Sequence, residues 1–207
     1  LKKAESFYQL SINIQPTQQS IIGLYHLYKQ SNRNDEIIKL LNNWLQEHPK
    51  DLIIGIAFAE THKNLGNIKF ALGYYKKLIE HHPNNPILLN NAAMTLLSLG
   101  HFQEATILAN QAHLLMPYNV TIIDTKAWIE TKKGNYKEAL YLLRQANAMA
   151  DDNFVVKYHL AITLDKLNRR NEGFSYLKDA ALSKSHYPEK KQVVILFNKW
   201  QLEKIET

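Results

Sequence analysis

Histidine offers the widest choice of chemistry in this sequence of 207 residues, which contains nine histidines and no cysteine. Metal sites on helices typically place two histidines four residues apart, so that both imidazoles reach one ion. No two histidines have that spacing, and there is no His-Glu-x-x-His motif. We therefore favour structural roles over a metal site, such as favourable contacts with the carbonyl ends of helices. The histidines are His26, His48, His62, His81, His82, His101, His113, His159 and His186.

Motifs for covalent catalysis or cofactor binding are also missing from the sequence. Without cysteine there is no thiolate nucleophile, and no two glycines lie close enough together to form a phosphate-binding loop. Ser175 and Lys178 match a Ser-x-x-Lys motif, but the companion motifs of that enzyme class are absent. Asp151 and Asp152 lie between two predicted helices, where capping of a helix start explains them. We predict a chain that is not an enzyme and that needs no cofactor.

Basic residues exceed acidic residues by 25 to 19, which gives a net charge of +6, but the two signs are mixed along the chain. A nucleic-acid surface would gather its basic residues on one face. The longest apolar stretch, 52–59, is far shorter than the roughly 20 residues of a membrane helix. We therefore predict neither nucleic-acid binding nor direct membrane insertion by this chain.

The elements that carry these residues repeat every 34 positions. Prolines recur at Pro49, Pro83 and Pro117. Small residues recur at Ala71, Ala105, Ala139 and Gly173, and turn residues recur at Gly66, Gly100, Gly134 and Asn168. On both sides of each turn residue the apolar positions follow the i, i+3, i+4, i+7 spacing of a helix. Each interval is therefore predicted to form two helices of about 13 residues, joined by a residue of positive φ.

The predicted helix starts have signals of their own. Asn85 precedes Pro86, which is an N-cap followed by proline at the first helical position. Asn119 is interpreted as an N-cap as well, and Asn135 has the spacing of a capping box with Glu138. A helix of this length is marginal when alone in water, so each one must bury its apolar stripe against its neighbours in a stack.

The pattern predicts an all-α fold in which antiparallel helix pairs form a single array over 1–207. The full units are 18–51, 52–85, 86–119, 120–153 and 154–187, and 1–17 is the second helix of an incomplete unit. Residues 188–207 form a capping helix, in which apolar residues cover the open end and lysines face water. The apolar residues are Val193, Val194, Leu196, Phe197 and Trp200, and the lysines are Lys190, Lys191, Lys199 and Lys204. Because the sequence starts in mid-pattern without a methionine, we interpret it as a fragment of a longer protein.

The unit 86–119 carries the most complete version of the pattern. It reads Pro86-Ile-Leu-Leu-Asn-Asn-Ala-Ala-Met-Thr-Leu-Leu-Ser-Leu-Gly100, continues with His-Phe-Gln-Glu-Ala105 and closes at Pro117. This pattern resembles the tetratricopeptide repeat (TPR). The resemblance implies a right-handed superhelical α-solenoid, whose first helices line a concave groove for a protein or peptide partner. Three departures from the family pattern, Lys126, Asp151 and Gly173, lead us to expect looser packing in units 120–153 and 154–187.

The groove implied by the resemblance has an unusual centre for a solvated surface. We expect an apolar and aromatic strip with a polar border, which suits an extended or helical peptide. The strip consists of Met94, Leu97, Trp128, Tyr158 and Ile162, and the border consists of Asn90, Asn91, Asp124 and Asp165, with His159 at the edge. The alternative is that tight curvature buries these residues against one another. Trp44 and Trp200, in contrast, are expected in the core.

Four short segments look like the C-terminal repeats of large bacterial TPR lipoproteins, which are associated with exopolysaccharide production and the PEP-CTERM protein-sorting system. The segments are Leu89-Asn90-Asn91, Asp124-Thr125 with Trp128, Leu142 to Ala146 and Tyr158 to Ala161. This likeness implies a periplasmic or envelope-associated protein with a role in exopolysaccharide or envelope protein export. Without it, the expectation is a cytoplasmic protein.

The function favoured by the sequence is that of a non-catalytic scaffold, which binds a peptide or protein segment in its concave groove. Homo-oligomerisation is left open. One alternative is an accessory repeat module of an enzyme-containing assembly for polysaccharide or glycosyl transfer. Another is direct binding of a glycan, because groove aromatics stack on sugars as well as on peptides.

Overall fold

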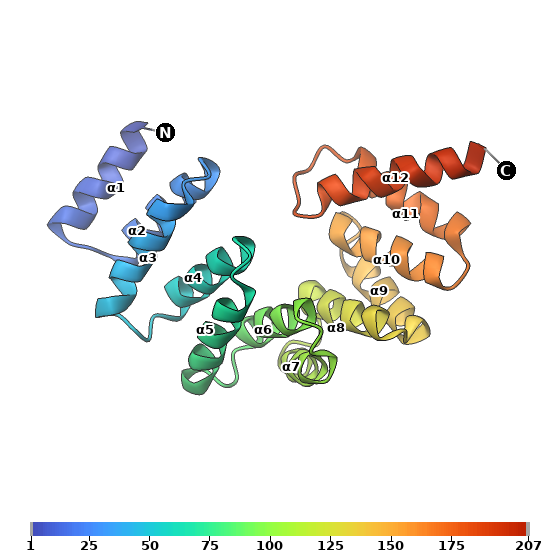
Figure 1. Cartoon of the computed structure of the whole chain (residues 1–207), viewed down its shortest axis with the longest axis horizontal. Helices are drawn as coiled ribbons and strands as arrows, with labels where there is room; N and C mark the ends of the chain where they lie inside the picture. Colours follow the sequence, from blue (N-terminus) through green and yellow to red (C-terminus); the bar gives the residue numbers. More distant parts are fainter. Residues whose placement is uncertain (1, 206–207) are drawn as a thin grey trace. The chain divides into compact units, whose positions relative to one another are not determined.

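The computed structural model describes residues 2–205 (Figure 1). Within this range the chain consists of helices joined by short connections and contains no strand, so the predicted all-α fold is confirmed. The helices are α1 (Lys2–Ile14), α2 (Gln18–Gln30), α3 (Asn34–Glu47), α4 (Leu52–Asn64), α5 (Ile68–His81), α6 (Pro86–Ser98), α7 (Phe102–Leu115), α8 (Val120–Lys133), α9 (Tyr136–Met149), α10 (Phe154–Lys166), α11 (Arg170–Leu182) and α12 (Lys190–Ile205). No helix in the described range is long and apolar enough to cross a membrane.

The helices form two compact units, residues 1–100 with α1 to α6 and residues 101–207 with α7 to α12. In the first unit α4 packs on α5, and in the second α8 packs on α9 and α10 on α11. The division falls after Gly100, inside the predicted interval 86–119. The organisation of 1–207 as one array therefore stays a prediction.

The turn within a helix pair is made by a residue with a left-handed backbone. The φ angle is 85° at Gly66, 78° at Gly100, 90° at Gly134 and 59° at Asn168, as the 34-residue column predicts. Asn32, one interval before Gly66, has a φ of 54° and extends the series by a position that we did not predict. Glycine and asparagine are the residues that adopt this conformation at least cost, so this column fixes where the chain reverses.

The caps of the first helices follow the sequence, whereas one predicted capping box is wrong. The side chain of Asn85 accepts from the N–H of Leu88 (2.9 Å), and Asn119 accepts from the N–H of Ile122 (3.1 Å). Asn135 makes no such cap bond; its Nδ2 instead donates to Glu130 Oε2 (2.5 Å). The backbone of Asn135 (φ −83°, ψ 56°) lies outside the extended region that capping requires, and it follows directly on the left-handed Gly134.

The core of the first unit lies among α2, α3 and α4. Trp44 is 8% exposed, its Nε1 donates to Asp51 Oδ2 (2.7 Å), and its ring stacks on His48 at a centroid separation of 3.9 Å. The predicted core position of Trp44 is therefore confirmed, and its single polar atom is satisfied by the residue that caps α4.

Large and small residues change places between the repeats. A Cβ at Gly55 of α4 would lie 2.9 Å from Leu78 of α5, so the leucine fills the space that a side chain at position 55 would take. Two intervals later in the sequence the same positions hold Ile123 and Ala146, which belong to one cluster of the second unit. The close fit of a pair depends on the summed volume of the two residues rather than on either one alone.

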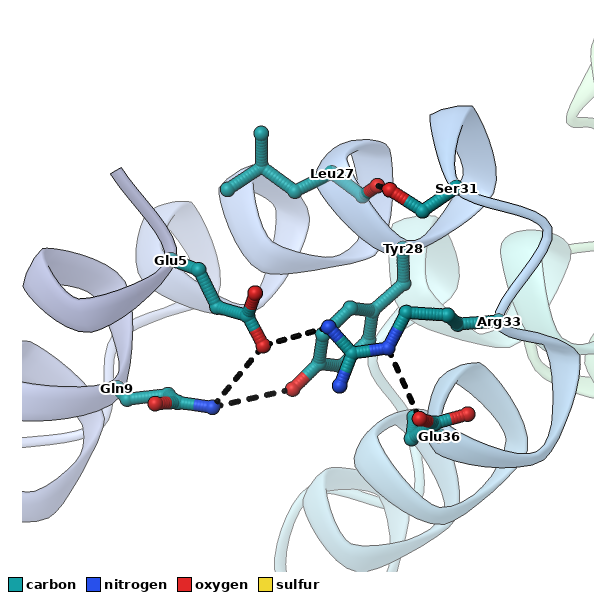
Figure 2. A network of polar contacts seen from close by, with 7 residues as sticks. All are labelled: Glu5, Gln9, Leu27, Tyr28, Ser31, Arg33 and Glu36. Atoms are coloured by element: carbon teal, nitrogen blue, oxygen red, sulfur yellow. Dashed lines mark hydrogen bonds and ion pairs between the residues drawn. The ribbon is translucent and has the colours of Figure 1, made fainter. Parts of the chain in front are cut away.

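A polar junction attaches α1 to the first unit (Figure 2). Arg33, at the start of α3, donates to Glu5 of α1 (2.6 Å) and to Glu36 of α3 (2.9 Å). Its guanidinium lies 4.2 Å from the ring centroid of Tyr28 in α2, and the hydroxyl of Tyr28 accepts from Gln9 of α1 (3.3 Å). One arginine thus links three helices, with one bond to each of two carboxylates and a cation–π contact.

Gly173 lets α11 approach α10 closely. A Cβ at this position would lie 3.0 Å from the carbonyl oxygen of Ala161 and 3.3 Å from the Cβ of Leu164. The expectation of looser packing at Gly173 is therefore wrong. The space of the missing methyl group is taken up by the shorter separation of the two helices.

Asp151, which replaces the closing proline of its unit, takes part in an ion pair rather than a cap. The N-cap of α10 is Asn153, whose side chain accepts from the N–H groups of Val155 (3.1 Å) and Val156 (3.2 Å). Asp151 lies 3.4 Å from the Nζ of Lys157, which also contacts Asp179 (3.2 Å). Our interpretation of the aspartate pair as helix caps is therefore wrong.

The last helix starts at Lys190 and buries Val193, Phe197 and Trp200 against α11. We predicted that Lys190 faces water, and this prediction is wrong. Its Nζ donates to the carbonyl oxygens of Ala180 (3.0 Å), Ala181 (2.8 Å) and Ser183 (2.6 Å) at the end of α11. These carbonyls have no partner within their helix, and a cation is favoured there by the helix dipole. The side chain of Lys204 lies outside the described residues.

Candidate functional site

The predicted groove residues belong to both units. Asn90, Asn91, Met94 and Leu97 lie on α6 of the first unit. The others lie in the second unit, on α8 (Asp124 and Trp128) and on α10 (Tyr158, Ile162 and Asp165). The two sets are therefore two candidate surfaces, one on each unit.

On α6, three of the four residues are half-buried and the fourth is in the interior. Asn91, Met94 and Leu97 keep part of their surface accessible. Asn90 is only 5% exposed, and its Oδ1 has no hydrogen-bond partner among the described residues. The expectation that Asn90 forms a polar border is wrong, because a residue this deeply buried offers little to a ligand at the surface.

In the second unit a buried polar pair joins α8 to α10. Asp124 Oδ1 lies 2.7 Å from the Nδ1 of His159, and the two residues are 8% and 4% exposed. Further along the same two helices, the hydroxyls of Thr131 and Thr163 are 2.9 Å apart. Asp124 and His159 were expected at the border and the edge of the groove, and this expectation is wrong. They hold two first helices together, since buried polar groups are stable there only when they pair.

Trp128 is fixed by the same histidine. Its indole stacks on the His159 ring, with centroids 4.0 Å apart and planes 13° from parallel. The Nζ of Lys132 lies over the indole, 4.3 Å from its centroid, and Tyr158 is 6.4 Å away. Trp128 and Tyr158 nevertheless keep part of their surface accessible. The side chains of this strip therefore pack on one another and still face solvent, and ligand binding by the strip stays a prediction.

The far end of the strip carries a neutralised acid. Asp165 Oδ1 accepts from Arg170 Nε (2.6 Å), and Arg170 also reaches Glu203 of α12 (2.6 Å). Beside it, Ile162 is half-buried, and burial raises the pKa of the Tyr158 hydroxyl. The second unit therefore presents an apolar and aromatic strip of Trp128, Tyr158 and Ile162, whose acids are engaged within the protein.

The buried pair of Asp124 and His159 is out of reach of a ligand at this surface. Asp124 and His159 have the residue types of a catalytic pair, but a reacting atom must reach the base, and His159 lies against Trp128 in the interior. Within the described range there is no group of three or more His, Asp or Glu side chains that could hold a metal ion.

Sequence reasoning missed the pairing of Asp124 with His159, although a signal was present. The two residues are 35 positions apart, one interval plus one residue. Neighbouring repeats therefore bring them side by side on adjacent first helices. An acid and a histidine at that separation are a testable pattern in any array of this period.

Comparison with known proteins supports the repeat assignment. A family model described as tetratricopeptide repeat matches residues 1–118, more than half of the chain. No curated protein matches the sequence. The finer likeness to PEP-CTERM and exopolysaccharide-associated lipoproteins receives no support from the family model or from the solved structures.

Solved structures share the fold at low sequence identity. A tetratricopeptide repeat protein from Parabacteroides merdae is 16% identical with a TM-score of 0.79, over 98% of this chain and 80% of that chain. A thermophilic TPR protein from Thermus thermophilus is 19% identical with a TM-score of 0.77, over 90% and 100%. A chain of the APC/C hetero-tetramer Cut9–Hcn1 is 16% identical with a TM-score of 0.78, over 93% and 38%.

The family match, the 34-residue period and the helix pairs that turn at Gly66, Gly134 and Asn168 all agree. This chain belongs to the tetratricopeptide repeat family.

Proposed function

We propose that this chain is a non-catalytic scaffold that binds an extended or helical peptide segment of a partner protein on the strip formed by Trp128, Tyr158 and Ile162. TPR proteins are generally scaffolds for protein–protein interaction, and this strip lies on the first helices of two neighbouring pairs. The observation that carries the proposal is the fixed, partly accessible indole of Trp128, stacked on His159 at 4.0 Å.

A fixed aromatic side chain is a favourable anchor for a partner. An indole loses little conformational entropy on binding when its rotamer is already set, so more of the burial energy contributes to affinity. Tryptophan and tyrosine are enriched among the residues that dominate binding energy at interfaces. The acids Asp124 and Asp165 are already paired with His159 and Arg170, so the partner is held mainly by apolar contact.

The proposal is tested by selecting peptides from a random-sequence phage library on the full chain. Binding of the selected peptides, carrying a fluorescent label, is then measured by fluorescence anisotropy. Trp128→Ala should weaken binding about 30-fold, which corresponds to an anchor worth about 2 kcal/mol. Ile162→Ala, a smaller side chain on the same strip, should weaken it less.

The matched control is Tyr141→Ala, which removes an aromatic residue that is 67% exposed on α9, a second helix. This variant should bind like the wild type. Equal affinity of wild type, Trp128→Ala and Ile162→Ala would overturn the proposal. Circular dichroism of each variant checks that the loss is not due to unfolding.

The same aromatic strip carries the glycan alternative, because sugars stack on aromatic rings. A glycan array probed with the full chain distinguishes a peptide ligand from a glycan ligand. If the chain retains a glycan, if this retention depends on Trp128 and if no peptide is selected, the ligand is a carbohydrate. The proposal assigns no export pathway, because the lipoprotein likeness that pointed to one has no support in the comparisons.

A further inference from the structure

Helix α7 combines an inward face of alanines with an outward face of large aliphatic residues. The side that faces the protein is built from alanines, with Ala105, Ala109 and Ala112 at most 1% exposed. The side that faces solvent carries Ile107 at 64% and Leu114 at 82% exposed. A helix normally places its larger aliphatic side chains inward, where burial stabilises the fold.

The exposed stripe continues beyond the helix. Ile107 and Leu114 are seven residues apart and so lie on one face of α7, and Tyr118 in the following loop is 78% exposed. At the positions of Leu114 and Tyr118, the preceding interval has Glu80 and Asn84. Exposed apolar side chains that the preceding repeat replaces with polar ones indicate an interface.

The stripe is also almost free of charge. The segment 102–119 contains one charged residue, Glu104, whereas 68–85 contains four and 136–153 contains five. Glu104 lies at the start of α7 and contacts His101 (2.9 Å). A surface that docks on a membrane would pair its apolar residues with Lys or Arg. Depletion of charge together with exposed tyrosine is typical of the centre of a protein–protein interface.

We propose that the outward face of α7 is a two-fold contact between two copies of this chain, with the two α7 helices antiparallel. In a two-fold contact the same patch meets itself, so a charged patch would repel its copy, and this patch has no charge at its centre. The exposed amides Gln103 and Asn110 flank the stripe, and an amide both donates and accepts, so it pairs with its own copy. The antiparallel arrangement also keeps the two Glu104 carboxylates apart.

This inference is independent of peptide binding by the first helices, and it is tested by the oligomeric state. Analytical ultracentrifugation of the full chain over about 1 to 100 µM should show a reversible dimer. Leu114→Glu should raise the dissociation constant about tenfold or more, because it places two buried charges in the contact. The chain should stay folded, since Leu114 is 82% exposed.

The matched control is Leu182→Glu, a leucine of α11 that is 62% exposed and lies two intervals after Leu114. It should leave the dimer unchanged. The chain has no cysteine, so Asn110→Cys, which lies beside the stripe midway between Ile107 and Leu114, should give a covalent dimer on mild oxidation, whereas Gly73→Cys on the exposed face of α5 should not.

Three results would overturn the inference. The first is a wild-type protein that stays monomeric over the whole range. The second is an equal effect of Leu114→Glu and Leu182→Glu on the dimer. The third is a monomer that floats with vesicles of three parts phosphatidylcholine to one part phosphatidylglycerol and loses this binding in Leu114→Glu, because the stripe would then be a membrane contact.

Discussion

Removing the imidazole of His159 should lower the free energy of unfolding by more than the loss of one ordinary hydrogen bond would. Asp124 Oδ1 lies 2.7 Å from the histidine, and the two side chains are 11% and 5% exposed. His159→Leu therefore leaves a carboxylate buried between α8 and α10 without its partner. Breaking a buried pair in this way costs about 3 kcal/mol or more. The free energy of unfolding, measured by urea denaturation at pH 7, should fall by that amount.

The effect of pairing is separated from that of burial by two more variants, Asp124→Leu and the double variant Asp124→Leu with His159→Leu. With leucine at both positions no buried charge remains, and the free energy of unfolding should return to within about 1 kcal/mol of the wild type. The stacking of Trp128 is lost in every variant that lacks His159, so it cancels in the double-mutant cycle. A coupling free energy of about 2 kcal/mol or more is expected. If both single variants cost under about 1 kcal/mol and the coupling is near zero, the pair does not hold the helices together.

Three further predictions concern the packing, the last helix and acid stability. Gly173→Leu should lower the free energy of unfolding by about 1–3 kcal/mol through overpacking against Ala161. Gly73→Ala, where a Cβ meets nothing within 4 Å, should raise the free energy of unfolding by up to about 1 kcal/mol. Thermal melts followed by circular dichroism compare the two variants. Lys190→Met removes three hydrogen bonds to the end of α11 and should cost about 1–2 kcal/mol in urea denaturation, while Lys191→Met, an exposed neighbour, should cost nothing measurable. Burial works against ionisation of Asp51, but hydrogen bonds from Gln18, the N–H of Ile54 and Trp44 outweigh it and hold the pKa of this carboxyl below its usual 3.8. The ionised carboxylate therefore contributes to stability above that pH, and this contribution is lost as the pH falls below it. Asp51→Asn should reduce the loss of stability at acid pH, and an unchanged pH dependence would contradict the assignment.

The helical fold could be predicted from the sequence because its signals are local and repeat. A residue of positive φ is required wherever a pair turns, and glycine or asparagine supplies it at Gly66, Gly134 and Asn168. An N-cap is needed at each first helix, and Asn85 and Asn119 supply it. These requirements involve neighbouring residues only, so a single sequence displays them.

The candidate site was less accessible to sequence reasoning because it depends on contacts between helices. The nine groove positions come from the family geometry, and the sequence alone does not show how deeply each side chain is buried. It therefore predicts Asn90 and Asp124 at the border, although both are buried. The same holds for Lys190, which is charged and was expected in water but reaches the open carbonyls of the preceding helix. Gly173 was misjudged because one column gives a residue's size and not the distance between the helices.

Binding of the partner to the strip on α8 and α10 can be tested by site-specific photocrosslinking. A benzophenone amino acid is placed at Ile162 on the strip or at Tyr141 on the outward face of α9, and each protein is irradiated with a selected peptide. We expect a covalent adduct from position 162 that excess unlabelled peptide abolishes, and none from position 141. An adduct from position 141 alone, or equal adducts from both, would contradict it.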